Sequence, residues 1–205
     1  MSSRDLLIEI GTEELPPKAL NSLSFALKEL VVNALESEAL SFESVARFAT
    51  PRRLAVLIKK LPESQEDKEI SRLGPTLSAA YDETGNPTAA AIGFAKSCGV
   101  GIKDLSSSKK NGVEKLAFTL TKKGQQTIEL IPNIVKTALS DLPAPKRMRW
   151  GSSREEFVRP IHWLLLLFGK EVVKTNLYGV NSDKTTWGHR FHCNKEIPID
   201  ELLGD

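Results

Sequence analysis

The sequence has few cysteines, few histidines and no long apolar run. Its 205 residues include 2 cysteines and 3 histidines. Two cysteines far apart in the chain, after a start without an apolar leader, indicate reduced thiols in a cytoplasmic protein. The strongest apolar stretch, Ile161–Phe168, is shorter than the roughly 20 residues that a membrane helix needs. We therefore expect neither a disulfide-stabilised secreted domain nor a membrane anchor.

Motifs that mark common catalytic sites are also missing. The chain has no phosphate-binding loop of the form G-x-x-x-x-G-K-[ST], no dinucleotide fingerprint and no G-x-S-x-G nucleophile elbow. His189, His192 and Cys193 lie close together in the sequence. On a strand, however, His192 would point away from the other two, and no second group of ligands accompanies them. We predict no catalytic residue and no metal site.

Positive and negative charges nearly balance over the whole chain, but positive charges exceed negative ones in one part of it. The net charge is +2, from 28 Lys and Arg against 26 Asp and Glu, so global charge favours neither RNA nor an anionic membrane as a partner. All tryptophans and histidines lie in a basic-aromatic tract, residues 145–192. Arginine forks and aromatic faces suit a phosphate-rich partner. Solvated surface charges and core tryptophans are the alternative interpretation, which composition leaves open.

The order of strand and helix patterns predicts an α+β fold, with mostly antiparallel sheets, packed helices, and one large or two small domains. A short strand at Leu6–Ile10 precedes two prolines and a helical stripe from Leu20 to Ala34. We expect a strand–helix–strand–strand unit in residues 1–62 and a second α+β part in residues 63–205. Pro132 either starts or kinks the last of the expected helices. The other expected strands are 42–48, 53–61, 70–74, 113–121, 157–169, 171–180, 187–193 and 197–199, the other helices are 89–98 and 127–142, and polar loops are expected at 62–68 and 101–111.

Charged residues at the ends of these elements are candidates for contacts. Arg52 and Arg53 form a basic pair at a tight turn, which would present two guanidinium groups at a sheet edge, and Arg190 stands in the segment GHRF. Phosphate contacts and intramolecular salt bridges are both open interpretations for these arginines. Glu13 and Glu14 precede the first helix, and we expect them to start or cap it, because carboxylates are favourable at the positive end of the helix dipole.

Six segments in a fixed order resemble one known family. They are LLIEIGTEELPPKAL at 6–20, FATPRRLAVLI at 48–58, GNPTAAAIGFAKSCGV at 85–100, KRMRWG at 146–151, FVRPIHWLLLLFG at 157–169 and GHRFH at 188–192. Together they resemble the beta subunit of bacterial-type glycyl-tRNA synthetase. No single segment is decisive, but the ordered set is specific. The family's subunit is much longer, so the chain, which stops at DELLGD, is expected to be an N-terminal fragment.

The resemblance implies a noncatalytic part of the ligase that joins glycine to its tRNA. In the family, two alpha and two beta subunits assemble, and the alpha subunit holds the aminoacylation core with ATP and magnesium. The beta subunit chiefly recognises and positions tRNA, so the implied partners are the alpha subunit and tRNA-Gly, and no cofactor is expected in this chain. A protein-docking scaffold and an editing-type hydrolase, with His189, His192 or Glu14 in its site, are the alternatives. The candidate tRNA or partner contacts are Arg52, Arg53, Lys146, Arg147, Arg149, Trp150, His189 and Arg190.

Overall fold

The chain forms two units, of which the larger is discontinuous in sequence. The structure, a computed structural model, describes residues 2–82, 85–110, 112–143, 148–149, 156–200 and 202. One unit combines Met1–Gln65 with Gln125–Asp205, and the other is Glu66–Gly124. This division differs from the expected boundary at residue 62, because the strand at Ile161–Phe168 returns to pair with the strand at Ser3–Thr12. The second half of the chain therefore completes the sheet that the first half begins.

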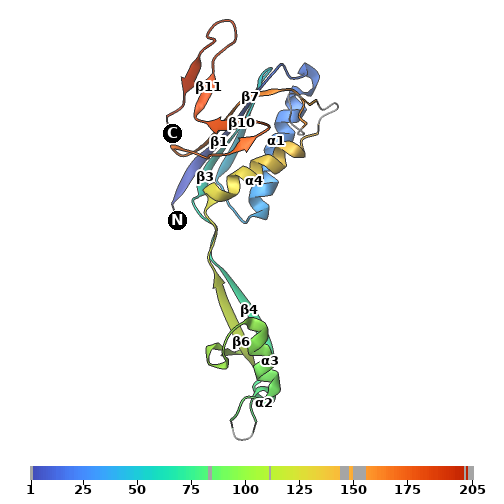
Figure 1. Ribbon diagram of the computed structural model, residues 1–205, viewed down its shortest axis with the longest axis vertical. Helices are drawn as coiled ribbons and strands as arrows, with labels where there is room; N and C mark the ends of the chain where they lie inside the picture. Colours follow the sequence, from blue (N-terminus) through green and yellow to red (C-terminus); the bar gives the residue numbers. More distant parts are fainter. Residues whose placement is uncertain are drawn as a thin grey trace. The chain divides into compact units, whose positions relative to one another are not determined.

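The larger unit is built on one sheet of mostly antiparallel strands (Figure 1). Its strands are β1 (Ser3–Thr12), β2 (Ser44–Thr50), β3 (Arg53–Pro62), β7 (Ile161–Phe168), β8 (Glu171–Val172), β9 (Asn176–Leu177) and β10 (Val180–Asp183). They lie in the order β2-β3-β1-β7-β10-β9, with β8 beside β7. β10 runs parallel to β7, and every other pair in the sheet is antiparallel. The α+β class with mostly antiparallel sheets is confirmed.

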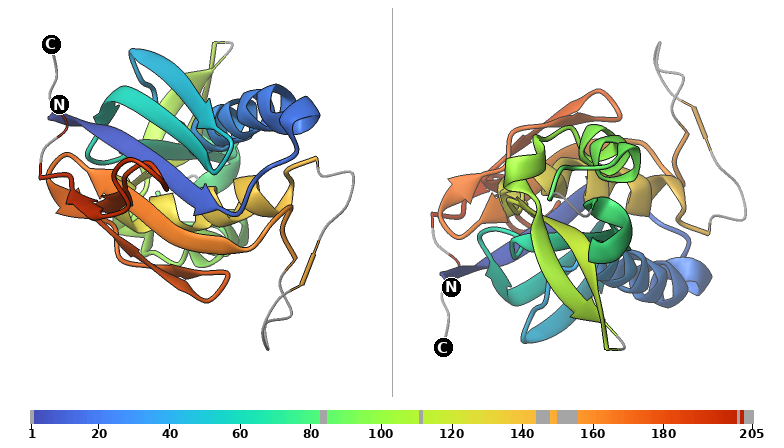
Figure 2. Two further views of the ribbon diagram at one scale, coloured as in Figure 1. Left: turned by 90° about the horizontal axis from the view of Figure 1, so that it is seen from above. Right: turned by 90° about the horizontal axis from the view of Figure 1, so that it is seen from below.

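Two helices cover one face of this sheet, α1 (Pro17–Ser37) and α4 (Thr127–Ser140) (Figures 1 and 2). Alternate residues of the strands point to this face, as the period of two requires. They form a single core with the apolar stripes of the helices, and that core supplies most of the driving force for folding. The buried side chains at its centre include Leu6, Ile8, Ile10, Leu23, Leu27, Val31, Leu54, Val56, Ile58, Ile131, Val135, Leu139, Leu164 and Leu166.

The opposite face of the sheet carries a small hairpin of β11 (Thr185–Trp187) and β12 (Glu196–Pro198). Glu9 and Gly11 of β1 alternate with the core residues Ile8 and Ile10, so they point to this helix-free face. Thr186 of the hairpin donates a hydrogen bond to the Glu9 carboxylate. The hairpin is thereby fixed above the ends of β1, β3 and β7, which is where the candidate site lies.

The smaller unit has its own sheet and a modest core. Its elements are β4 (Lys68–Thr76), α2 (Leu77–Ala80), α3 (Ala89–Cys98), the 3-10 turn Ile102–Asp104, β5 (Ser106–Lys110) and β6 (Val113–Lys122). The strands pair in the antiparallel order β4-β6-β5. Ala80, Ala91 and Leu116 are buried at its centre. The expected stop of the helix at Gly99 is confirmed, since this residue adopts the left-handed conformation at φ 71°.

The helix expected over 127–142 is confirmed as α4, which begins at Thr127, whose hydroxyl donates to the Pro62 carbonyl at 2.6 Å. Pro132 lies inside this helix and does not start it. Three local expectations are wrong. The segment 101–111 is not wholly a loop, because β5 pairs along β6 despite its polar composition. The strand expected over 171–180 is divided among β8, β9 and the start of β10. Only Trp187 of the segment 187–193 belongs to a strand, and the rest turns back towards β12.

Both cysteines are free thiols. None of the helices in the described parts of the chain has both the length and the apolar character of a membrane span.

Candidate functional site

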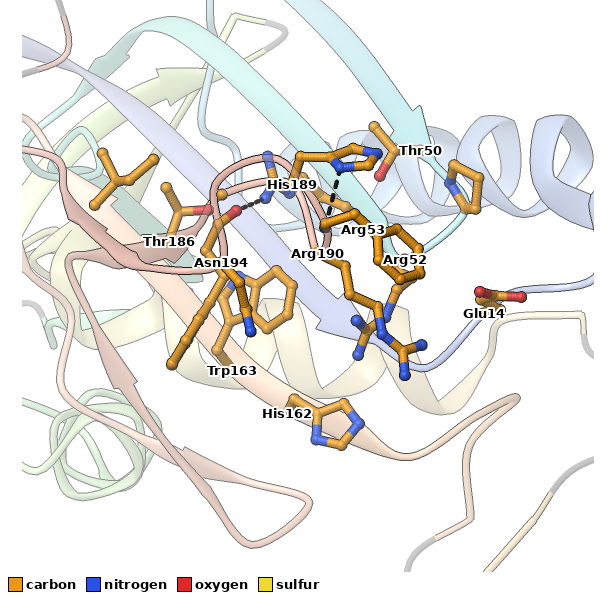
Figure 3. A pocket seen from close by; sticks show the side chains of 15 residues that line it. Glu14, Thr50, Arg52, Arg53, His162, Trp163, Thr186, His189, Arg190 and Asn194 are labelled. Atoms are coloured by element: carbon orange, nitrogen blue, oxygen red, sulfur yellow. Dashed lines mark hydrogen bonds between the residues drawn. The ribbon is translucent and has the colours of Figure 1, made fainter.

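Four of the candidate residues converge on one pocket of about 770 Å³ in the larger unit (Figure 3). Arg52 lies in the turn between β2 and β3, Arg53 is the first residue of β3, and His189 and Arg190 come from the turn of the β11–β12 hairpin. More than a hundred residues of sequence separate the two pairs, so only the tertiary fold brings them together. The described lining residues are Glu14, Thr50, Pro51, Arg52, Arg53, His162, Trp163, Thr186, Trp187, Gly188, His189, Arg190, Phe191, Asn194 and Ile197.

The floor of the pocket is a row of three cross-strand neighbours. Gly11 of β1 pairs with Arg53 of β3 on one side and with Trp163 of β7 on the other. A Cβ atom at Gly11 would lie only 1.9–2.2 Å from the Trp163 ring, so the indole occupies the space that a side chain would fill. The Arg53 guanidinium lies 5.6 Å from the centre of that ring, at cation–π distance. The glycine thus allows an aromatic ring and a cation to meet across the middle strand.

The carboxylate of Glu9 contacts two residues of this row as well as the hairpin. Its side chain is buried and accepts hydrogen bonds from Trp163 Nε1 at 2.8 Å and from the Thr186 hydroxyl. Arg53 Nε lies 3.3 Å from Glu9 Oε1 in an ion pair. Arg53 also donates to the backbone carbonyl of Trp187. Arg53 therefore holds the hairpin against the sheet. Of the two interpretations of this arginine, the intramolecular salt bridge describes the contacts that it makes within the chain.

A second charged group lies at the mouth of the pocket. Arg52 donates to the Thr12 carbonyl at 3.2 Å, and its terminal nitrogen lies 3.7 Å from Glu13 Oε2. His162 Nε2 lies 2.8 Å from Glu13 Oε1. The expectation that Glu13 caps the first helix is wrong, because α1 begins at Pro17 without a side-chain cap and Glu13 contacts β7 and the β2–β3 turn instead.

These contacts change the ionisation of Glu13. The hydrogen bond with His162, together with the positive charges of Arg52 and Arg190, lowers the pKa of the Glu13 carboxyl despite its partial desolvation. The shift stabilises the folded chain above the ordinary glutamate pKa, and this stabilisation disappears as the pH falls through the lowered value. We expect NMR titration to give Glu13 a pKa below that of an exposed glutamate. His162→Ala should raise it, and an unchanged value in that variant would contradict the assigned cause.

The rim of the pocket is the turn that follows β11. The Cys193 amide donates to the His189 carbonyl at 2.8 Å, and the Gly188 amide donates to the Lys195 carbonyl at 3.0 Å. This turn leaves Phe191 80% exposed, with the Arg190 guanidinium 5.6 Å from the centre of its ring. Arg190 makes no close ion pair with any described residue. The rim therefore presents a cation and a planar ring directly to solvent.

Of the remaining candidate contacts, the structure describes only Arg149. Arg149 pairs with Glu156 at 2.6 Å and is not among the lining residues. Lys146, Arg147 and Trp150 lie outside the described residues. The His192 ring stacks 4.7 Å from the His189 ring, but His192 does not line the pocket. Within the described ranges, no three His, Cys, Asp or Glu side chains are grouped to hold a metal ion.

Sequence reasoning missed the residues that build the pocket, namely Glu9, Gly11, His162, Trp163 and Thr186. Glu9, His162 and Trp163 belong to strands that were expected, but their partners come from other segments of the chain. Gly11 was expected to follow the first strand, which was predicted to end at Ile10, and Thr186 lies before the strand expected at 187–193. Because β1 continues through Gly11 to Thr12, this residue is a glycine within a strand, which marks a close approach by another group.

Comparison with known proteins identifies relatives over nearly the whole chain. Residues 6–203 match the profile of the family described as glycyl-tRNA synthetase beta subunit. The glycine–tRNA ligase beta subunit of Marinobacter nauticus is 46% identical over 199 residues, 97% of this chain and 29% of that protein. Those of Coxiella burnetii (strain RSA 493) and Pseudomonas aeruginosa (strain LESB58) are 47% and 49% identical, with 97% of this chain covered in each case and 29% and 28% of those proteins. The chain thus spans less than a third of the length of these relatives.

Proposed function

The chain belongs to the family of glycyl-tRNA synthetase beta subunits, and on this basis we propose that it is a tRNA-binding part of a glycine–tRNA ligase. In this proposal the chain positions tRNA-Gly and associates with the catalytic alpha subunit. The family resemblance further implies a cytoplasmic enzyme of two alpha and two beta subunits. It also assigns ATP and magnesium to the alpha subunit, and we adopt both points as part of the proposal.

The observation that carries the proposal is the pocket shared by Arg52 and Arg190. Both side chains line the same pocket (Figure 3), and the positive charge of each lowers the pKa of the Glu13 carboxyl. The charge of Arg52 is partly balanced by Glu13 at 3.7 Å, and Arg190 is open to solvent. A phosphate group is the anion that two arginine forks near one another suit best, because each fork donates two parallel hydrogen bonds.

We expect tRNA-Gly to bind the chain in a strongly salt-dependent way. Each phosphate contact releases condensed counterions, so the affinity should fall steeply between about 50 and 200 mM salt. Arg190→Ala should weaken binding and reduce the slope of log affinity against log salt by about one. Fluorescence anisotropy with labelled tRNA-Gly measures both quantities.

The matched control is Arg47→Ala. Arg47 lies on β2 against α1, where it donates to Asn21 at 3.0 Å, and it is not among the pocket residues. This variant loses the same charge as Arg190→Ala, so equal effects of the two substitutions would reveal a response to net charge alone. Absence of tRNA binding at low salt would contradict a direct role in binding tRNA.

Docking of the alpha subunit is the second candidate function, and one observation favours it. Phe191 is 80% exposed and Phe48 is 55% exposed, both in the larger unit. Aromatic residues are frequent anchors in protein–protein interfaces. Co-elution of the chain with the alpha subunit in the absence of tRNA would support docking, and its loss in Phe191→Ala would locate it at the hairpin turn.

A further inference from the structure

The pocket is lined by three kinds of group, namely arginines at the mouth, planar side chains along the wall and rim, and the carboxylate of Glu14. A nucleotide has one partner for each of them, namely a phosphate, a base and a pair of ribose hydroxyls. A nucleotide ligand from RNA rests on the proposed function that the chain binds tRNA.

The phosphate has a defined position at the mouth of the pocket. Arg52 and Arg190 line the pocket together (Figure 3), and both are close enough to Glu13 to lower its pKa. Arg53 is less available, because its donors are directed to Glu9 and to the Trp187 carbonyl. One phosphate between Arg52 and Arg190 would accept charge-assisted hydrogen bonds from both.

The base has a stacking surface at the rim. Phe191 is 80% exposed, so the face of its ring is available to another planar group. Trp187 lines the same pocket, and its backbone is held by Arg53. Stacking on such rings is tolerant of base identity, because every base has a π-face.

The ribose has an acceptor in Glu14. Glu14 lines the pocket with the two arginines, and its backbone carbonyl accepts a hydrogen bond at 3.1 Å from Nε of Arg159, which precedes β7. A carboxylate accepts hydrogen bonds from ribose hydroxyls, as in dinucleotide sites. The 2′-hydroxyl is the group that distinguishes RNA from DNA.

The size of the pocket excludes a duplex. A cavity of about 770 Å³ lies within the range of small-molecule and nucleotide sites. Bases within a helix present only their edges, whereas stacking on protein rings requires an unpaired base that is turned out of the helix. We therefore propose that this pocket binds one unpaired ribonucleotide of the RNA, with its phosphate on Arg52 and Arg190, its base on Phe191 and Trp187, and its ribose on Glu14.

The test compares four probes with the full chain of residues 1–205. They are a single-stranded RNA of about eight nucleotides, a length within the range of single-strand sites, the blunt duplex of the same sequence, the DNA strand of that sequence, and AMP. Quenching of tryptophan fluorescence reports contact, because Trp163 and Trp187 line the pocket. We expect the RNA strand to bind about tenfold more tightly than the duplex or the DNA strand.

Two pairs of variants locate the binding. Phe191→Ala should weaken binding of the RNA strand about tenfold through lost stacking, whereas Phe48→Ala, another exposed phenylalanine outside the pocket, should not. Arg190→Ala should weaken it and Arg47→Ala should not. Glu14→Ala should abolish the preference for RNA over DNA, because it removes the acceptor for the 2′-hydroxyl. Phe191 and Arg190 are exposed, so circular dichroism should show unchanged folding in their variants.

The possible results separate this inference from the proposed function. Equal affinity for strand and duplex, or an unchanged affinity in Phe191→Ala while tRNA-Gly still binds, would overturn the nucleotide pocket alone. Binding of AMP as tight as that of the strand would overturn RNA as the source of the nucleotide. Absence of tRNA-Gly binding by the unmodified chain would overturn the proposed function itself.

Discussion

Glu9→Ala is expected to destabilise the larger unit by about 3 kcal/mol, near the lower end of the cost of breaking a buried ion pair. The Glu9 side chain is 9% exposed and that of Arg53 28% exposed, so the substitution leaves a largely buried guanidinium without its counter-charge. It also removes the acceptor for Trp163 Nε1 and for the Thr186 hydroxyl. The unpaired charge and the lost hydrogen bonds both lower the stability of the folded unit. Urea denaturation followed by tryptophan fluorescence measures the loss.

The control for Glu9→Ala is Glu63→Ala. Glu63 pairs with Arg4 at 2.5 Å, with side chains 32% and 39% exposed, and such solvated pairs contribute little to stability. A double variant of Glu9→Ala with Arg53→Met tests the cause, because it removes the orphaned charge as well. It should be more stable than Glu9→Ala alone. Equal costs for Glu9→Ala and Glu63→Ala would show that Glu9 is not a buried anchor.

Gly11→Ala is expected to cost about 3 kcal/mol, the upper end of the usual range for overpacking a core. The new Cβ would lie 1.9–2.2 Å from three carbons at the centre of the Trp163 ring, so the indole has to leave its place. Its hydrogen bond to Glu9 and its contact with Arg53 would be lost with it. The same variant should lose the fluorescence response to RNA, because the floor of the pocket is displaced.

Gly93→Ala is the matched control for this glycine substitution. Gly93 lies within α3, and nothing lies within 4 Å of a Cβ placed there, so alanine should stabilise the smaller unit slightly through helix propensity. A double-mutant cycle gives the cause. In a Trp163→Ala background Gly11→Ala should cost little, and a full cost in that background would mean that the strain arises elsewhere.

Two neighbouring arginines have different roles in the pocket, one in its stability and one in contacts with a ligand. Arg52 and Arg53 are adjacent in sequence, but alternate residues of a strand point to opposite sides, and the turn before β3 directs them to different partners. Arg53 reaches Glu9 beneath the pocket, and Arg52 reaches Glu13 at its mouth. The first arrangement stabilises the pocket, and the second leaves a cation available to a ligand.

The elements with a strong local pattern were predictable. The stripe from Leu20 to Ala34 has helical spacing and forms α1, whose start after Pro16 follows from the fixed φ of Pro17. The apolar run at Ile161–Phe168 forms β7, buried within the sheet. The polar segment Ser106–Lys110 has no such pattern, so β5 was not foreseen.

The candidate site was predictable only in part. The basic composition of the Arg52–Arg53 turn and of the GHRF segment pointed to residues that line one pocket. Their partners were not visible, because the contacts of Glu9 come from strands far apart in sequence and Glu13 had an apparent local role at the helix start. That local role was wrong because Glu13 contacts His162 and Arg52, both distant in sequence.

Apolar side chains recur every two residues along a strand and every 3.6 residues along a helix, and a short segment of sequence is enough to show either period. Composition and spacing therefore established the α+β class, the main strands and the first helix. Which strands become neighbours depends on the burial of whole faces by segments far apart in sequence. The pairing of β1 with both β3 and β7 is of that kind. It placed Gly11 between Arg53 and Trp163, and the pocket exists because of that placement.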